Sequence, residues 1–81
     1  MFYFYTLQST HDSKYYFGST NDLKRRVLEH QAGKVTSTKN RLPLELVYYE
    51  AYRKLSQARY REKQVKNSGS IRKALLTRLE Q

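Results

Sequence analysis

Residues 16–30 read YFGSTNDLKRRVLEH and form the most informative segment of the chain. Its aromatic start is typical of a strand, and the polar residues that follow are good helix caps. Leu23 and Val27 then recur at the four-residue spacing of one helix face. The stretch therefore predicts a strand, a turn and a helix over residues 22–31. Gly18 permits either a tight turn or a backbone that comes close to a ligand.

The same helix would carry two functional side chains on one face. Arg26 and His30 are four residues apart, and Tyr16 stands in the strand before them. A phenol, a guanidinium and an imidazole that converge can hydrogen-bond and neutralise a phosphodiester. The alternative is an aromatic strand followed by an ordinary solvated basic helix. The spacing alone favours this alternative, because short motifs are weak signals.

Four pieces of the chain follow one another in the order and spacing of a known family. They are Tyr3-Phe4-Tyr5, Tyr16-Phe17-Gly18, Asn21 to Arg26 with His30, and Ala58 to Glu62. On these residues the chain resembles a GIY-YIG nuclease domain over about residues 2–66, and in particular the small stand-alone bacterial members. The resemblance implies an active site of Tyr5, Tyr16, Arg26 and His30, with Glu62 as the carboxylate that binds a metal.

The chain departs from the family pattern at two places. Tyr3 and Phe4 stand where the first motif has glycine and isoleucine, which the small members tend to allow. The asparagine that larger members place well after the glutamate has no counterpart, since Asn67 lies too close to Glu62. Both departures leave the expected fold intact and bear on catalysis alone.

Length and composition predict one small basic domain over residues 1–81. Sixteen Lys and Arg against seven Asp and Glu give a net charge of +9, which favours nucleic acid as partner over an acidic membrane. A ribosome-associated protein would share this charge. The chain has no cysteine, no apolar run that could span a bilayer and no charged signal-peptide start. We therefore expect a cytoplasmic protein of the bacterial cytosol or nucleoid, without a membrane partner.

Read along the chain, the periodicity gives the order β-β-α-β-α-α. Strands are expected at residues 2–8, 14–18 and 44–52, and helices at residues 22–31, 55–66 and 71–79. This predicts an α/β (α+β) fold in which helices flank a small three-stranded antiparallel sheet. Four side chains of the third strand are expected on one face: Leu44, Leu46, Tyr48 and Tyr52. Ser56 is expected to cap the second helix, and Gly69 to end it.

Glu62 stands within the apolar stripe that Leu55, Ala58 and Val65 form on the second helix. A carboxylate directed inward is costly unless it is paired or binds a cation. The alternative to a metal is a salt bridge to one of the arginines. Because the metal position of the family falls on the same residue, we favour Mg²⁺, which suits a single carboxylate by keeping its waters and taking phosphate oxygens.

Nucleic-acid contacts are expected from cations near the site and from a mobile basic loop over residues 32–41, although that loop also fits an ordinary polar surface. The residues concerned are Lys24, Arg25, Lys34, Lys39, Arg41, Arg59 and Lys63. Most of the eight tyrosines are expected to be structural, with Tyr5 and Tyr16 as the exceptions.

The resemblance implies a metal-dependent DNA endonuclease that uses Mg²⁺ or Mn²⁺ and no organic cofactor. Glu62 would hold the metal, Arg26 would offset the developing charge, and Tyr5, Tyr16 or His30 would position or deprotonate the attacking water. Two alternatives stay open: a weak or inactive nucleic-acid-binding module, and a basic component of a ribonucleoprotein. The choice between DNA and RNA also stays open, as do branched or nicked substrates and a partner protein that supplies specificity.

Overall fold

The computed structural model describes residues 1–81. Its elements are β1 (Phe2–Ser9), β2 (Tyr15–Thr20), α1 (Leu23–Gln31), the short 3₁₀ helix η1 (Lys39–Arg41), β3 (Leu44–Tyr52), α2 (Leu55–Asn67) and α3 (Gly69–Leu79). The predicted β-β-α-β-α-α order is confirmed, with η1 as an addition inside the loop before β3.

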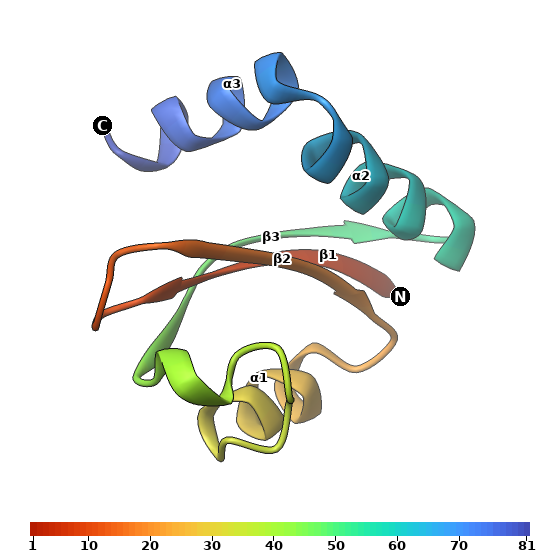
Figure 1. Ribbon diagram of the computed structural model, residues 1–81. Coiled ribbons are helices and arrows are strands. Elements are labelled where there is room, and N and C mark those ends of the chain that lie inside the picture. The colour runs from red at the N-terminus through yellow and green to blue at the C-terminus, as the bar shows by residue number, and fades with distance from the viewer.

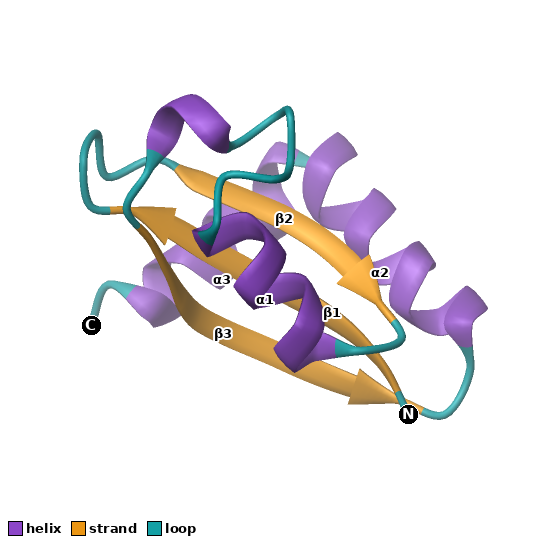
Figure 2. Cartoon of the chain, turned by 90° about the horizontal axis from the view of Figure 1, so that it is seen from below, coloured by secondary structure: helices purple, strands orange, loops and turns teal.

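The three strands form one antiparallel sheet in the order β2-β1-β3. Helix α1 covers one face of this sheet, and α2 and α3 cover the other (Figure 1). Figure 2 shows the face that α1 covers, with α1 in front of the sheet and running in nearly the same direction as the strands. The predicted fold class is therefore confirmed, and β2 and β3 are the two edge strands. None of the helices has the length and apolar character needed to cross a bilayer.

Strand β1 carries buried apolar side chains on both of its faces, because helices cover both faces of the sheet. Successive side chains of a strand point to opposite faces. Tyr5 and Leu7 pack with Leu44 on the α1 side, whereas Phe4 packs with Phe17 and residues of α2 and α3 on the other. The core is thus split into two thin layers on either side of the sheet.

The face pattern predicted for β3 is wrong. A β-bulge interrupts its pairing with β1, where Thr6 lies opposite Tyr48 but the next residue, Leu7, lies opposite Leu46. Val47 is therefore an extra residue, and every side chain after it changes face. Tyr48 and Tyr52 pack on the α2 and α3 side, away from Leu44 and Leu46, because strict alternation holds only in an unbroken strand.

Glu50 explains two of the tyrosines on that side of β3. Its carboxylate accepts hydrogen bonds from the hydroxyl groups of Tyr48 at 2.6 Å and Tyr52 at 2.5 Å. Arg61 of α2 donates a third bond through Nε at 3.1 Å. A half-buried carboxylate is thereby satisfied, as buried polar groups generally are. These phenols join the sheet to α2, which is a structural role.

The structure confirms only some of the helix ends expected from the sequence. Asp22 caps α1 by accepting from the backbone N–H of Arg25 at 3.1 Å. At the start of α2, the Gln57 side chain accepts from the N–H of Lys54 at 3.1 Å, so the expected cap at Ser56 is wrong. Gly69 does not end α2 either, because Ser68 caps α3 and Gly69 is its first residue.

Candidate active site at the edge of β2

Tyr5 lies in the central strand β1, directly opposite Gly18 of the edge strand β2. A Cβ atom on Gly18 would stand 2.5 Å from the Tyr5 hydroxyl oxygen and 2.6 Å from Cζ. The glycine is therefore needed to make room for the phenol. Gly18 lies within β2, so the expected tight turn at this residue is wrong.

Three of the predicted catalytic side chains form one ring cluster beneath α1. The ring centroids of Tyr5 and Tyr16 are 6.4 Å apart, those of Tyr5 and His30 5.8 Å, and those of Tyr16 and His30 5.0 Å. Tyr5 is 1% exposed and His30 is fully buried, whereas Tyr16 is half-buried. Only Tyr16 among the three can therefore touch a macromolecular substrate.

A hydrogen-bond chain passes through the buried part of this cluster. The Tyr5 hydroxyl lies 2.9 Å from Nε2 of His30, and Nδ1 of His30 lies 2.8 Å from Oγ1 of Thr38. Thr38 is fully buried although it belongs to the loop before β3. Sequence reasoning missed this residue, because a threonine among other polar loop residues carries no signal of burial.

Burial sets the protonation of the two inner side chains. It raises the pKa of Tyr5 to about 12, even though the Arg26 guanidinium acts on the hydroxyl as a hydrogen-bond donor and a positive charge that lower it. Burial, followed by the charge of Arg26, lowers the pKa of His30 to about 4. At neutral pH both groups are therefore uncharged.

Glu62 reaches β2 from α2, which lies on the face of the sheet opposite α1. Its Oε1 accepts from the Ser19 hydroxyl at 2.5 Å, and its Oε2 lies 2.5 Å from Nζ of Lys66. The side chain is 22% exposed. The Lys66 ammonium also lies 5.8 Å from the centroid of the Tyr16 ring. The charge on this carboxylate is thus balanced by a lysine one turn away instead of an arginine.

Two cavities that share Ser19 and Arg59 form a trough over the β2 edge, between α1 and α2. One has a volume of about 380 Å³ and the other of about 400 Å³. Five cationic side chains line the trough: Arg25, Arg26, Arg59, Lys63 and Lys66. Arg26 also pairs with Glu29 at 3.3 Å. The trough therefore combines strong positive charge with the Glu62 carboxylate.

The trough also suits a divalent cation at Glu62. No three His, Cys, Asp or Glu side chains gather in the structure, so a metal would rest on one carboxylate with the Ser19 hydroxyl beside it. Mg²⁺ accepts such a site because it keeps most of its waters. The cavity of about 400 Å³ next to Glu62 leaves room for those waters and for a phosphate.

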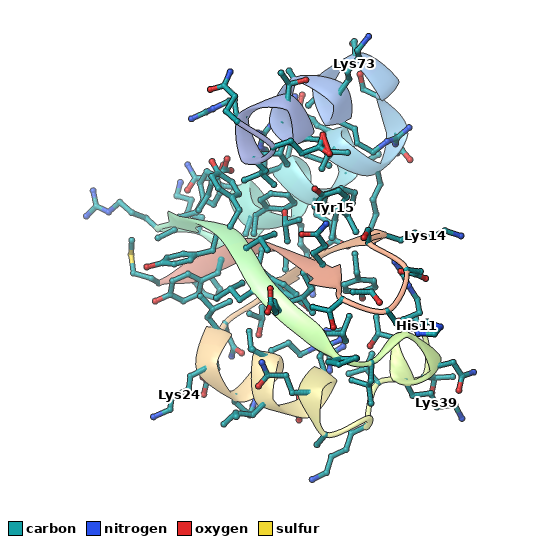
Figure 3. The ribbon with its side chains drawn as sticks, turned by 90° about the vertical axis from the view of Figure 1, so that its left-hand side faces the viewer. His11, Lys14, Tyr15, Lys24, Lys39 and Lys73 are labelled. Atoms are coloured by element: carbon teal, nitrogen blue, oxygen red, sulfur yellow. The ribbon has the colours of Figure 1, made fainter.

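The other predicted nucleic-acid contacts lie apart from the trough. Lys24 and Lys34 line a cavity on the outer side of α1, and Lys24 and Lys39 point away from the protein (Figure 3). Arg41 is held inward, because its Nη2 donates to the Tyr15 carbonyl at 3.3 Å. The structure therefore groups Arg25, Arg59 and Lys63 with the candidate active site, and places the remaining four elsewhere.

Comparison with known proteins gives the same family as the motifs. The model of the GIY-YIG catalytic domain matches residues 1–73. A UPF0213 protein of Natronomonas pharaonis is 39% identical over 75 residues, which cover 91% of this chain and 87% of that protein. A UPF0213 protein of Bacillus pumilus is 42% identical over 65 residues, or 75% of this chain. The match spans 65% of that protein, less than two thirds of its length.

A solved structure supports the assignment. The solution structure of a UPF0213 protein from Bacillus halodurans matches 98% of this chain and 85% of its own, with 33% identity and a TM-score of 0.59. A GIY-YIG catalytic domain implies a nuclease-like protein with a nucleic-acid substrate, and such nucleases generally use a divalent metal. The chain belongs to the GIY-YIG family, among its small UPF0213 members.

Proposed function

We propose that this protein is a metal-dependent endonuclease that hydrolyses phosphodiester bonds of DNA. The observation that carries the proposal is the trough at the β2 edge. It holds Arg26 at one end and Glu62 at the other, and Ser19 lines both of its cavities. A phosphodiester in this trough would meet a guanidinium and a carboxylate-bound cation from opposite sides, which is the charge arrangement that phosphoryl transfer needs.

Glu62, Arg26 and Tyr16 have distinct parts in the proposed reaction. Water adds to phosphorus, a bond from phosphorus to a sugar oxygen breaks, and the proton that the water loses is balanced by one that the leaving sugar oxygen takes up. A divalent metal on Glu62 would supply Lewis-acid stabilisation of the phosphate oxygens. Arg26 offsets the charge that develops on the same phosphate. Tyr16, the one ring of the cluster that reaches the surface, orients the attacking water or takes its proton.

Tyr5 and His30 have a supporting part in this proposal. Both are buried, and at neutral pH both are uncharged with their facing atoms joined by a hydrogen bond of 2.9 Å. A general base must come within hydrogen-bond reach of the proton that it removes. We therefore assign these two residues to the positioning of Arg26 and Tyr16, and the role of base or water-orienting group to Tyr16.

The decisive experiment compares the wild type with Glu62→Gln on supercoiled, linear, nicked and branched DNA, with Mg²⁺ or Mn²⁺. Glutamine keeps the size of the side chain and can still accept from Ser19, but it removes the charge that would hold the metal. We expect metal-dependent cleavage by the wild type and none by the variant. Equal residual nicking by both proteins would point to a contaminant and overturn the proposal.

One observation favours a second function. Both oxygens of Glu62 are already engaged, one by Ser19 and one by Lys66. A carboxylate held in this way is suited to shaping a basic trough that binds nucleic acid without cutting it. Tight DNA binding by the wild type, with no cleavage in either metal on any of the four substrates, would support this binding module.

A further inference from the structure

Thr38 is the unexplained member of the candidate site. It lies between the exposed residues Ser37 and Lys39, yet its own side chain is completely buried. Its hydroxyl has one partner, Nδ1 of His30 at 2.8 Å. Besides the backbone hydrogen bonds of Gly33 and Lys34 to α1, the loop before β3 thus contacts α1 through the Thr38 hydroxyl, and this contact ends on a ring of the candidate active site.

The direction of the hydrogen bonds in the chain follows from the donors available. The Arg26 guanidinium acts on the Tyr5 oxygen as a positive charge, which favours the orientation in which the oxygen lone pairs face Arg26 and the hydroxyl proton points away from it. The hydroxyl proton of Tyr5 then has His30 Nε2, at 2.9 Å, as its acceptor. An uncharged imidazole with a bare Nε2 carries its proton on Nδ1. That proton is donated to the hydroxyl oxygen of Thr38.

We propose that Thr38 is a positioning residue for Arg26, and that it acts by fixing the tautomer of His30. By accepting the Nδ1 proton, Thr38 keeps Nε2 free to accept from Tyr5, and the lone pairs of Tyr5 stay available to Arg26. In the opposite tautomer Nε2–H would compete with Arg26 for the Tyr5 oxygen. The catalytic part of this inference rests on the role proposed above for Arg26, whereas the tautomer itself does not.

The experiment uses the full chain labelled with ¹⁵N, and the variants Thr38→Val and Thr38→Ser. Valine keeps the shape of threonine without its hydroxyl, and serine keeps the hydroxyl without the methyl group. The ¹⁵N chemical shifts of the two His30 ring nitrogens report which of them carries the proton. The Nε chemical shift of Arg26 reports a change in the surroundings of its guanidinium. Thr36→Val, at an exposed position of the same loop, is the matched control.

We expect the wild type, Thr38→Ser and Thr36→Val to show the Nδ1–H tautomer. Thr38→Val should shift His30 toward Nε2–H, move the Arg26 signal and lower kcat about tenfold with little change in KM, the scale at which orienting partners act. If the valine variant does not fold, Thr38→Ala takes its place with the same expectations.

An unchanged tautomer or an unchanged Arg26 signal in the hydroxyl-free variant would overturn the inference. A changed tautomer with an unchanged cleavage rate would overturn its catalytic part. Absence of cleavage in every protein, including the wild type, would count against the proposed endonuclease alone, because both nitrogen signals are read without DNA or metal.

Discussion

Tyr5 and Gly18 face each other across the β1–β2 pair, and the phenol occupies the space that a side chain at Gly18 would need. Tyr5 belongs to the first family motif and Gly18 to the second, so this contact joins the two motifs directly. The aromatic residue of the first motif requires the absence of a side chain in the second.

Gly18→Ala should therefore destabilise the protein and displace Tyr5 from His30. The new methyl group would stand 2.5 Å from the Tyr5 hydroxyl oxygen, and overpacking of this kind lowers the free energy of unfolding by about 1–3 kcal/mol. Urea unfolding measures the loss. Gly69→Ala is the control: its Cβ would meet nothing closer than 3.8 Å, and alanine favours a helix by about 1 kcal/mol. Equal stability of the two variants would contradict the predicted clash.

Arg25 and Arg26 form a built-in comparison on α1. Both line the trough, but Arg26 alone interacts with Tyr5 of the ring cluster. Arg26→Ala should lower the cleavage rate by about two orders of magnitude or more, the scale of losing an electrostatic stabiliser. Arg25→Ala should weaken DNA binding and leave the rate at saturating DNA close to that of the wild type. Small and similar losses at both positions would mean that neither residue is catalytic.

His30 should make the stability of the protein depend on pH. Its pKa is about 4 in the folded protein, mainly because of burial, and about 6.5 in an unfolded chain. Between these values the unfolded chain binds the additional proton, so the free energy of unfolding falls as the pH drops from about 6.5 to about 4. The full loss is about 3 kcal/mol.

Urea unfolding at about pH 7 and about pH 5 tests this dependence. His30→Gln removes the titrating ring, and the stability of that variant should change much less between the two pH values. It should also be less stable at neutral pH, because the bridge from Tyr5 to Thr38 is lost. The same pH dependence in both proteins would show that another group is responsible.

DNA affinity should fall steeply with salt. The trough presents five cations, two of which already pair with Glu29 or Glu62. Each phosphate neutralised contributes about −0.9 to the slope of log K against log salt on duplex DNA, so we expect a slope between about −3 for the three unpaired cations and about −4.5 for all five, with little sequence preference. Binding titrations between low and moderate salt measure it. Tight binding that depends on sequence but hardly on salt would instead indicate that exposed aromatic side chains read bases.

The order of the elements was predictable because each depends on local chemistry. Aromatic and β-branched runs, the Asp22 cap and the apolar spacing of Leu23 and Val27 all act over a few residues. The bulge at Val47 was not predictable in this way, since it is decided by pairing with β1 far away in the chain. One additional residue there reverses the faces of the tyrosines that follow.

The candidate site was likewise predictable only in part. The motifs identify Arg26 and Glu62, which line the trough, and Tyr16, whose ring centroid lies 5.8 Å from the Lys66 ammonium. They do not reveal that His30 and Tyr5 are buried or that Thr38 joins them, because these facts depend on how the loop before β3 closes over α1. Nor do they show that Arg41 is held inward by the Tyr15 carbonyl.

The position of the trough on an edge strand has a consequence for how copies of the protein meet one another. An edge strand offers unpaired backbone groups to any other strand, and natural proteins often protect such edges with charged side chains. Strand β2 is bordered by Arg25, Arg26, Arg59, Lys63 and Lys66. Two such edges repel each other, whereas a polyanion is attracted. The charges that we propose to bind a nucleic acid would thereby also oppose self-association of the protein through this edge of its sheet.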